Sequence, residues 1–133
     1  MKRYNCIVVY EKKRNKFLFC ERKENPYKGL LNFVGGKIEK GESSESAAYR
    51  ELYEETGISP KNIVLFHLMD ISYYKRQVML EIFIGIIEKN VNLIEEKQKL
   101  FWISGTENFF DLNRFAGDGN IGHIIYQATD YIQ

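Results

Sequence analysis

The sequence predicts an α/β fold in which a β-sheet is sandwiched between α-helices, a three-layer α/β/α arrangement. Short apolar runs rich in β-branched and aromatic residues recur along the chain and indicate strands, whereas two longer segments have helical patterns. Two helices are enough to cover the two faces of one sheet. With 133 residues the chain is long enough for a buried core, and we expect a single domain over residues 1–133.

The first third of the chain contains three predicted extended segments. Residues 6–10 have the β-branched apolar pattern of a buried strand, and residues 17–20 follow a charged turn as the second arm of a hairpin. Residues 21–30 are polar and include a proline and a glycine, so we expect a loop. Residues 31–34 then predict a short extended piece that leads to a glycine pair.

The helix that follows has clear ends. Ser43 or Ser44 can supply the N-cap oxygen, and the alanines and glutamates after it are good helix formers. Thr56 and Gly57 end the helix, because glycine adopts the left-handed conformation at little cost.

The second half of the chain predicts further strands and a last helix. The expected strands are residues 63–69, 78–87 and 100–103. Thr106 is expected to cap a short turn of helix through residues 109–112. Apolar residues recur at helical spacing from residue 120 to 131, which predicts an amphipathic C-terminal helix.

Three glutamates lie on one face of the middle helix. Glu51, Glu54 and Glu55 are three and four residues apart, and like charges at that spacing repel by roughly 0.2–0.5 kcal/mol per pair. No lysine or arginine follows within a turn. A hard divalent cation would turn this repulsion into ligation, since carboxylates and backbone carbonyls are the ligands that Mg²⁺ prefers. The alternative is an acidic, solvated helix face.

The acidic helix belongs to a longer pattern, G-x5-E-x7-R-E-U-x-E-E-x-G-U, in which U is a bulky aliphatic residue. Its nine fixed positions are matched by Gly36, Glu42, Arg50, Glu51, Leu52, Glu54, Glu55, Gly57 and Ile58. Such fixed spacing is far more specific than a short glycine motif. The pattern, residues 36–58, is the Nudix box, and the chain closely resembles Nudix hydrolases of the MutT-like group. The resemblance favours a metal site over a solvated face.

The resemblance implies a Nudix fold, in which a mixed β-sheet lies between helices and the box forms a loop, a helix and a loop at the catalytic edge. It also implies a magnesium site in the box. Glu51 and Glu55 would bind Mg²⁺ directly, with Mn²⁺ as an alternative ion. Glu54 would bind it directly or through water, and the carbonyl of Gly35 or Gly36 would complete the site. Glycine suits this place because a side chain would obstruct the approach of the backbone to the ion.

Arg50 and Glu42 are expected to support this site, and Arg50 belongs with the three glutamates to the expected catalytic set. A guanidinium that precedes a row of carboxylates can hold their rotamers and reduce their repulsion. The alternative for Arg50 is an exposed helix arginine. Lys37, in the loop of the box, either contacts a phosphate or is an ordinary solvated lysine.

The general base has more than one candidate. Glu54 is the nearest by geometry, whereas related enzymes use a glutamate of a downstream loop, here Glu95 or Glu96. Both of these also suit a simple charged loop. The two histidines, His67 and His123, are expected in a strand and in the last helix, where packing or surface roles are more common than catalysis.

Substrate choice in this fold depends on residues outside the box. Asn32 matches a base-reading asparagine of a mammalian relative that hydrolyses oxidised purine nucleoside triphosphates, and Asp118 matches an acidic residue that reads the purine edge there. Asn120 matches an asparagine that reads oxidised guanine in bacterial MutT-like proteins. The aromatic residues that offer a stacking face are Phe33, Phe115 and Trp102.

Each of these residues also has a structural interpretation. Asn120 is a good N-cap, Asp118 lies between two glycines in a turn sequence, and Asn32 can satisfy loop backbone. Tyr73 and Tyr74 resemble the tyrosines found in this region of dinucleoside polyphosphate hydrolases, but cross-strand packing at the start of a strand explains them equally well.

The composition favours neither a membrane nor duplex nucleic acid as a partner, and the partner that the resemblance implies is a nucleotide. A formal net charge of +1 gives no electrostatic footprint for DNA or for a membrane surface. No apolar stretch approaches the ~20 residues that span a bilayer. Cys6 and Cys20 lie in apolar runs and are expected to be buried, reduced thiols of a cytoplasmic protein.

The sequence therefore predicts a Mg²⁺-dependent pyrophosphohydrolase that cleaves a nucleoside diphosphate linked to another moiety. The first candidate substrate is a purine nucleoside triphosphate such as 8-oxo-dGTP, giving the monophosphate and pyrophosphate. The alternative enzyme is a dinucleoside polyphosphate or mRNA-cap hydrolase, although RNA would favour a basic track. The alternative from another class is a non-catalytic nucleotide-sensing Nudix module, which usually lacks some of the box glutamates.

Overall fold

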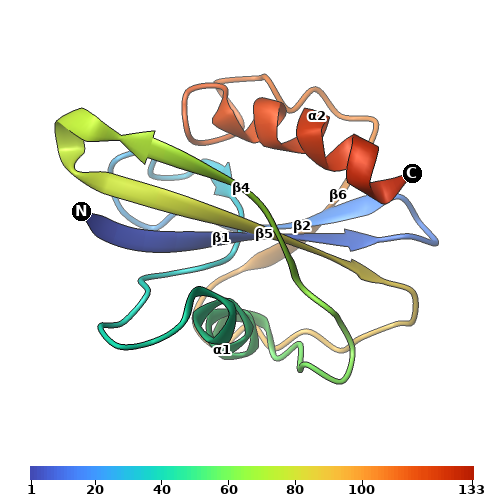
Figure 1. The fold of residues 1–133 in the computed structure, drawn as a ribbon. Helices are drawn as coiled ribbons and strands as arrows, with labels where there is room; N and C mark the ends of the chain where they lie inside the picture. The colour runs from blue at the N-terminus through green and yellow to red at the C-terminus, as the bar shows by residue number, and fades with distance from the viewer.

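The computed structural model describes residues 1–133 and shows one twisted sheet between two helices (Figure 1). The strands are β1 (Lys2–Glu11), β2 (Lys16–Glu21), β3 (Leu31–Asn32), β4 (Phe66–Tyr73), β5 (Val78–Ile87) and β6 (Leu100–Ser104). The helices are α1 (Ser44–Thr56) and α2 (Asn120–Ile132), with a 3₁₀ turn η1 (Tyr74–Arg76) between β4 and β5. Helix α1 covers one face of the sheet and α2 the other, so the three-layer prediction is confirmed.

The sheet is mixed because its two central strands are parallel. The order is β3-β2-β1-β5-β4, and β6 pairs with β2 outside this path. Strands β1 and β5 pair in parallel from Lys2 opposite Val78 to Glu11 opposite Ile87, and the other pairs are antiparallel. Strand β2 pairs with β1 only at the far end of β1, which leaves the rest of that edge for another segment.

Alternate side chains of β1 pack into two separate hydrophobic cores, one on each face of the sheet. Ile7 and Val9 pack on the α1 side with Leu52, whereas Val8 packs on the α2 side with Ile124. Both cysteines are free and buried, as expected. Burial raises the pKa of Cys6 and of Cys20 to about 12.

The ends of α1 agree with the sequence analysis. Ser43 is the N-cap and its hydroxyl oxygen accepts a hydrogen bond of 3.1 Å from the amide of Ser46. Gly57 ends the helix in the left-handed conformation at φ 79°, and its amide donates to the carbonyl of Tyr53. Hydrogen bonds and backbone conformation within the segment itself therefore define both ends of the helix.

One predicted strand boundary and one predicted turn of helix are wrong. Strand β4 begins at Phe66, not at residue 63, because Ile63 and Leu65 enter the core on the α1 side without joining the ladder. No helix forms after Thr106, whose hydroxyl lies 2.8 Å from that of Ser104, and the chain continues in turns that place Phe109 in the core. Tertiary packing overrides local preference at both places.

Neither helix has the length and hydrophobicity that crossing a bilayer requires.

Candidate active site

The loop after β3 fills the edge of β1 that β2 leaves open. The amide of Ile7 donates to the carbonyl of Val34 at 2.8 Å, and the amide of Ile38 donates to the carbonyl of Arg3 at 2.9 Å. Between them, the carbonyl of Gly36 accepts from the amide of Asn5 at 2.8 Å, whereas the carbonyl of Gly35 accepts no hydrogen bond. The glycine pair therefore offers one unused carbonyl oxygen, that of Gly35.

The carboxylate of Glu51 lies directly against this loop. A Cβ atom on Gly36 would stand 2.5 Å from the Glu51 carboxyl group, so glycine is required there for the helix and the loop to meet. Glu51 is only 8% exposed. Burial raises the pKa of the Glu51 carboxyl, while hydrogen bonds from Arg50 act in the opposite direction.

Arg50 holds several acidic groups at once. Its Nε and Nη2 donate to the two carboxylate oxygens of Glu42 at 2.6 and 2.9 Å. Its Nη1 donates to Glu51 at 2.9 Å and to Glu54 at 3.0 Å. Its Nη2 also donates to the carbonyl of Lys37 at 3.1 Å. The hydrogen bond from Arg50 lowers the pKa of Glu42 to about 2, so this pair stays charged at neutral pH.

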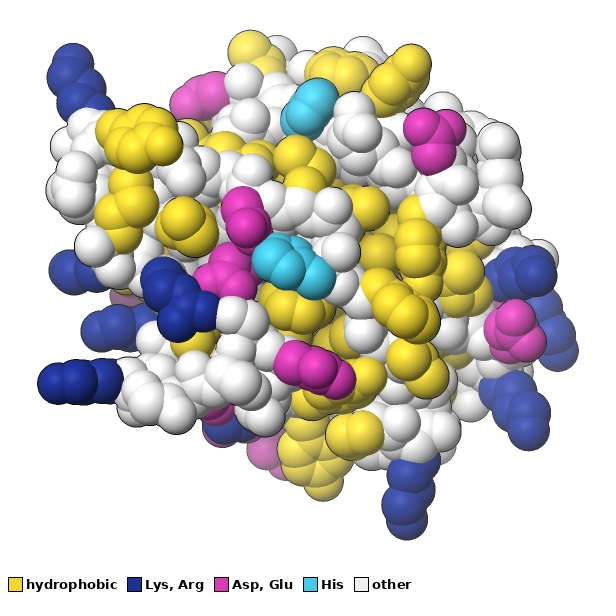
Figure 2. Space-filling model, in the orientation of Figure 1, with side chains coloured by type: hydrophobic (Ala, Val, Ile, Leu, Met, Phe, Trp, Pro, Cys, Tyr) yellow, Lys and Arg dark blue, Asp and Glu magenta, His cyan; other side chains and the backbone are white.

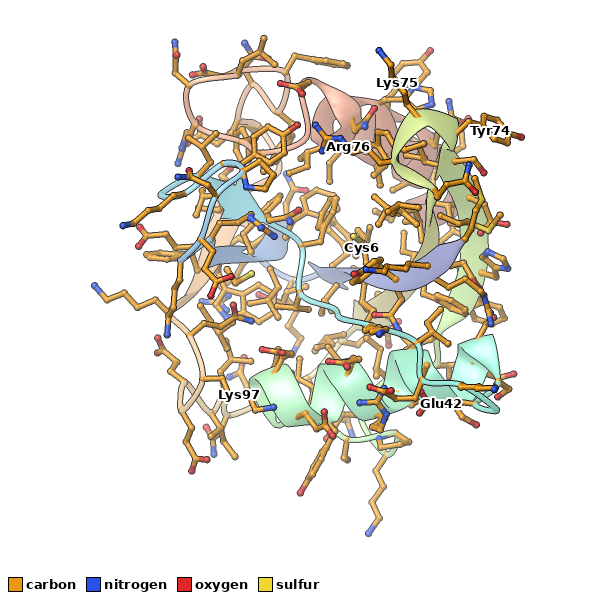
Figure 3. All side chains as sticks on the ribbon, turned by 90° about the vertical axis from the view of Figure 1, so that its left-hand side faces the viewer. Cys6, Glu42, Tyr74, Lys75, Arg76 and Lys97 are labelled. Carbon is orange, nitrogen blue, oxygen red and sulfur yellow. The ribbon has the colours of Figure 1, made fainter.

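Glu55 faces a hollow at the C-terminal half of α1. It lines this hollow together with Gly35 and Gly36, and its Oε2 accepts from Nε2 of Gln98 at 2.6 Å. Burial raises the pKa of the Glu55 carboxyl, and Lys97 counteracts that rise. Figure 3 shows Lys97 and Glu42 at opposite ends of α1, below Cys6 of β1.

The ligand atoms of the three box carboxylates do not all lie within 4.8 Å of one another. Arg50 donates to Glu51 and Glu54, and Gln98 donates to Glu55. The group of acidic and histidine ligand atoms that does come within 4.8 Å of one another is elsewhere, in His67, Asp70 and Glu81. There His67 Nε2 lies 2.5 Å from Asp70 Oδ1, and Arg3 donates to Glu81 at 2.7 Å, so these charges already have partners.

The residues of the box nevertheless fit a hard divalent cation. The ligand atoms available around the loop are all oxygens, namely the Glu51 carboxylate against Gly36, the Glu55 carboxylate in the adjoining hollow and the unused Gly35 carbonyl. Oxygen-only donor sets of this kind suit Mg²⁺ and Mn²⁺.

A cleft leads away from the loop toward the start of α2. One hollow of about 550 Å³ is bounded by Glu55 and Gly35 at one end and by Arg22 and Arg76 at the other. A second pocket of about 210 Å³ shares these arginines and continues to Asn120. In Figure 3, Arg76 lies above Cys6, on the side opposite α1.

Most of the predicted base-reading residues line the second pocket. Asn32, Phe33 and Asn120 are all part of its wall. Asn32 accepts through Oδ1 from the amide of Phe33 at 2.9 Å, which leaves its NH₂ group free of protein partners. The ring of Phe33 is buried and stacks on Phe19 with 4.9 Å between ring centroids.

Asn120 is not the N-cap of α2, which was the alternative role given for it. Gly119 is the N-cap residue of α2 and offers no side chain, and Asn120 instead donates through Nδ2 to the hydroxyl of Tyr73. Tyr73 ends β4 and Tyr74 lies exposed in the turn after it, so neither starts a strand. Asp118 accepts from the Tyr27 hydroxyl at 2.5 Å, at the rim of the same pocket.

Other candidates lie outside the cleft. Phe115 is 2% exposed within the aromatic core, and Trp102 packs against the core on the α1 side. Glu95 accepts from the amide of Leu100 at 3.1 Å, and it lines a charged hollow of the loop together with Glu96. Lys37 is exposed, and it is its carbonyl that takes part in the site.

The two histidines lie on the surface, as expected for packing or surface roles. His67 is exposed on β4, and His123 is exposed on α2.

Several cleft residues were missed by sequence reasoning. Gln98, not Glu95 or Glu96, is the residue of the downstream loop that bonds to a carboxylate of the box. Arg22 follows β2 directly, so its position after a strand was a usable signal. Arg76 lies in a turn of η1, and nothing in the local pattern distinguishes it from a solvated arginine.

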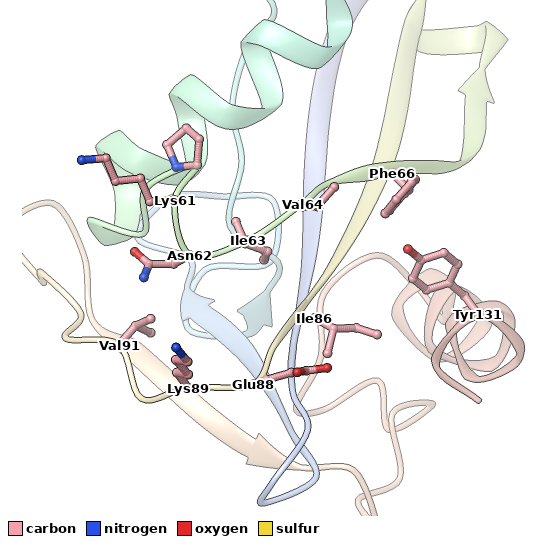
Figure 4. Close-up of a pocket in the computed structure, with 11 residues that line it drawn as sticks. Lys61, Asn62, Ile63, Val64, Phe66, Ile86, Glu88, Lys89, Val91 and Tyr131 are labelled. Carbon is pink, nitrogen blue, oxygen red and sulfur yellow. The ribbon is translucent and has the colours of Figure 1, made fainter.

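The other large hollow of the molecule contains none of the predicted site residues. It measures about 500 Å³ and lies between residues 60–66 and 86–91, next to Tyr131 (Figure 4). Figure 2 shows hydrophobic side chains exposed over the face that carries β4, with lysine and arginine side chains at its outline.

Comparison with known proteins decides the family. Residues 1–118 match the model of the NUDIX domain. The chain belongs to this family. It is 35% identical over 82 residues to the 8-oxo-dGTP diphosphatase of Escherichia coli, which covers 60% of this chain and 64% of the relative. It is 51% identical over 49 residues to the ADP-ribose pyrophosphatase of Methanocaldococcus jannaschii, which covers 37% of this chain and 29% of the relative. The matches thus span less than two thirds of these relatives.

Solved Nudix structures share the whole fold. The Ap4A hydrolase of C. elegans has a TM-score of 0.77 at 16% identity, covering 100% of this chain and 99% of that one. The MutT protein of Methanosarcina mazei Go1 has a TM-score of 0.68 at 22% identity, covering 98% and 93% of the two chains. At these identities the likeness shows the Nudix fold and confirms that prediction.

Proposed function

We propose that this Nudix protein is a Mg²⁺-dependent pyrophosphohydrolase that cleaves phosphoric anhydrides of nucleotides. The observation that carries the proposal is the meeting of the Glu51 carboxylate with the Gly35–Gly36 loop, at one end of a cleft that Glu55 also lines. The names of the curated relatives, a diphosphatase and a pyrophosphatase among them, support the same reaction class.

The roles of the box residues follow from their contacts. Glu51, Glu55 and the Gly35 carbonyl would hold Mg²⁺, with Mn²⁺ as the alternative ion and Glu54 as a further ligand or a ligand through water. When bound, the ion neutralises the anionic phosphate oxygens and lowers the pKa of a coordinated water. Arg50 fixes the rotamers of Glu51 and Glu54.

The proton of the attacking water needs a base. Glu54 is our first candidate, because its side chain is 40% exposed and lies on the same helix as the other two carboxylates. Glu95 and Glu96 stay as alternatives that would require the downstream loop to move, since Glu95 now accepts from the backbone of that loop. Arg22 and Arg76 give the cleft the positive charge that a substrate phosphate needs.

For the substrate we propose a purine nucleoside triphosphate, with 8-oxo-dGTP as one candidate and a monophosphate and pyrophosphate as products. The second pocket combines apolar walls, Leu80 and Ile124, with two amides. The NH₂ group of Asn32 and the Oδ1 atom of Asn120 are not used by the protein and can bind a purine edge. The buried thiols fit a cytoplasmic setting, which is part of this proposal.

A dinucleoside polyphosphate or capped RNA is the second candidate substrate. Tyr73 lines the base pocket, and the larger hollow extends beyond it between Arg22, Lys23 and Glu24. A non-catalytic sensor is less well supported, because Glu51, Glu54 and Glu55 are all present and Glu55 lines the cleft.

Two variants test the reaction. Glu54→Gln and Glu55→Gln should each reduce turnover by about 100-fold or more while thermal unfolding stays unchanged, since both side chains are outside the core. Glu45→Gln, an exposed position on the same helix, is the matched control and should keep full turnover. Wild-type turnover in either test variant would reject the assignment.

A substrate panel tests the specificity. Products should be separated after incubation with oxidised and normal nucleoside triphosphates, dinucleoside polyphosphates, capped RNA and ADP-ribose. We expect a purine nucleoside triphosphate to be hydrolysed fastest, with release of pyrophosphate. Asn32→Ala and Asn120→Ala should weaken the purine preference, and an unchanged preference in both would show that these amides do not read the base.

A further inference from the structure

Asn5 is a buried polar residue of β1, directly before the apolar run that starts at Cys6. It lies on β1, is 2% exposed, and shares the α1 side of the sheet with Ile7 and Val9 by the alternation of the strand. It contacts Gly36 twice. The Asn5 amide donates to the Gly36 carbonyl at 2.8 Å, and the Asn5 side-chain Oδ1 accepts from the Gly36 amide at 3.0 Å.

The second of these bonds replaces a backbone bond. The loop pairs with β1 in antiparallel register, with Tyr4 opposite Lys37 and Ile7 opposite Val34, so Asn5 lies opposite Gly36. Two residues in such a hydrogen-bonded pair normally exchange both backbone bonds. Here the Gly36 amide bonds to the side chain of Asn5 and not to its carbonyl.

This bond fixes the direction of the Gly35 carbonyl. The Gly35 carbonyl and the Gly36 amide belong to one planar trans peptide unit, in which C=O and N–H point in opposite directions. When Asn5 Oδ1 holds the N–H, the carbonyl oxygen of Gly35 must point away from Asn5. Glycine permits this close approach of the loop to β1, because a Cβ atom on residue 35 would stand 2.2 Å from the Asn5 carbonyl oxygen. The carbonyl held in this way is the one that accepts no hydrogen bond.

The other half of the Asn5 amide has no partner. Its Nδ2 is buried and makes no hydrogen bond, which destabilises a fold. An aspartate would remove that unpaired donor, but it would place a carboxylate beside Glu81, its register partner on β5, and close to Glu51. Asparagine is the side chain of this length that supplies an acceptor without a charge. The unpaired Nδ2 is the consequence of having an uncharged amide acceptor at this position.

We propose that Asn5 is a positioning residue that orients the Gly35 carbonyl toward the divalent cation. The inference rests on the proposed function, since it needs a cation at the box. Neither the box pattern nor any comparison with relatives assigns a role to β1 in metal binding.

The test measures metal affinity without substrate. Asn5→Leu keeps the shape of the side chain and removes the acceptor, and its removal of the unpaired Nδ2 offsets the lost bond, so we expect thermal unfolding close to that of the wild type. The affinity for Mg²⁺ by calorimetry, and for Mn²⁺ by electron paramagnetic resonance, should fall about 10–100-fold. Asn5→Asp keeps an acceptor for the Gly36 amide and should bind both ions nearly as well as the wild type.

Val9→Ala is the matched control, because it opens a cavity on the same face of β1, four residues farther along the strand than Asn5. It should lower the midpoint of thermal unfolding and leave Mg²⁺ affinity unchanged. If Asn5→Leu does not fold, Asn5→Ser replaces it, since a hydroxyl is too short to reach the Gly36 amide. Unchanged Mg²⁺ affinity in Asn5→Leu or Asn5→Ser overturns the role given to Asn5 and leaves the proposed function in place. Absence of Mg²⁺ binding by the wild type overturns the proposed function.

Discussion

Arg50 shows how much of the site depends on the geometry of one side chain. Its planar guanidinium donates to Glu42, Glu51 and Glu54 and also to a backbone carbonyl. A lysine ammonium carries the same charge, but it is a compact group on a flexible stem and cannot present donors in two directions at fixed angles. The arrangement of the carboxylates therefore depends on arginine and not only on positive charge.

We predict that Arg50→Lys lowers turnover by about 10–100-fold, because the carboxylates lose their fixed rotamers. The Mg²⁺ concentration for half-maximal activity should rise as well, which steady-state assays over a Mg²⁺ series will measure. Arg14→Lys is the matched control, since Arg14 pairs with the buried Glu11 at the first turn, outside the cleft. Equal effects of the two substitutions would contradict the role given to Arg50.

The Glu42–Arg50 pair also predicts a pH dependence of stability. The pKa of Glu42 falls from its ordinary value of 4.5 to about 2, so the folded state favours the charged form. The stabilisation is therefore complete above pH 4.5 and is lost as the pH falls through about 2. The difference in free energy of unfolding between the wild type and Glu42→Gln should shrink over this range. A difference that does not change with pH would contradict the pairing.

At the scale of the element, α1 combines local capping with tertiary contact. Ser43 and Gly57 define its ends, while Ala48 and Leu52 bury one face against the sheet. Glu51 lies on the buried side of this helix and meets the loop. The helix must therefore be both well formed and well docked for its acids to face the cleft.

We predict that Ser43→Ala lowers the free energy of unfolding by about 1 kcal/mol, because the Ser46 amide loses its acceptor. Denaturant unfolding will measure this change. Mg²⁺ affinity should stay the same, since Glu51 and Glu55 lie two or more turns along the helix. Ser46→Ala is the control, because the Ser46 side chain is exposed and makes no hydrogen bond. A loss of Mg²⁺ affinity in Ser43→Ala would show that the cap contributes to the site itself.

At the scale of the whole molecule, the sheet separates two cores that each contain one cysteine. Cys6 lies in the core on the α2 side, and Cys20 lies in the core on the α1 side. With each pKa raised to about 12, almost no thiolate is present near neutral pH. The reactivity of the two thiols therefore measures whether the core on each face of the sheet is closed to solvent.

We predict that neither thiol reacts readily with a thiol reagent at pH 8 in the folded protein, and that both react at once in denaturant. Reaction of two equivalents should follow the global unfolding transition measured by circular dichroism. Immediate labelling of the folded protein would show that one of the layers opens. If only Cys6 reacts, opening is confined to the pocket of about 210 Å³, which Cys6 lines and Cys20 does not.

The sequence by itself determined the features that depend on one element at a time. Hydrogen bonds of a helix and its caps are local, so the extent of α1 and the common face of Glu51 and Glu55 could be predicted from spacing. The β-branched runs likewise predicted β1 and β5 and the layered fold. The fixed spacing of the box gave the family, and with it the expected chemistry.

Only the tertiary structure decided which residues meet across elements. Three tertiary contacts bring Asn5, Arg76 and Gln98 to the cleft. They are the parallel pairing of β1 with β5, the pairing of the glycine loop with β1, and the contact of the loop between β5 and β6 with α1. Local sequence patterns carry the period of one helix or strand, whereas these contacts depend on strand register and on packing between distant segments. The choice of Gly35 over Gly36 as the free carbonyl was decided in the same way, by the hydrogen bond that Gly36 makes to the neighbouring strand.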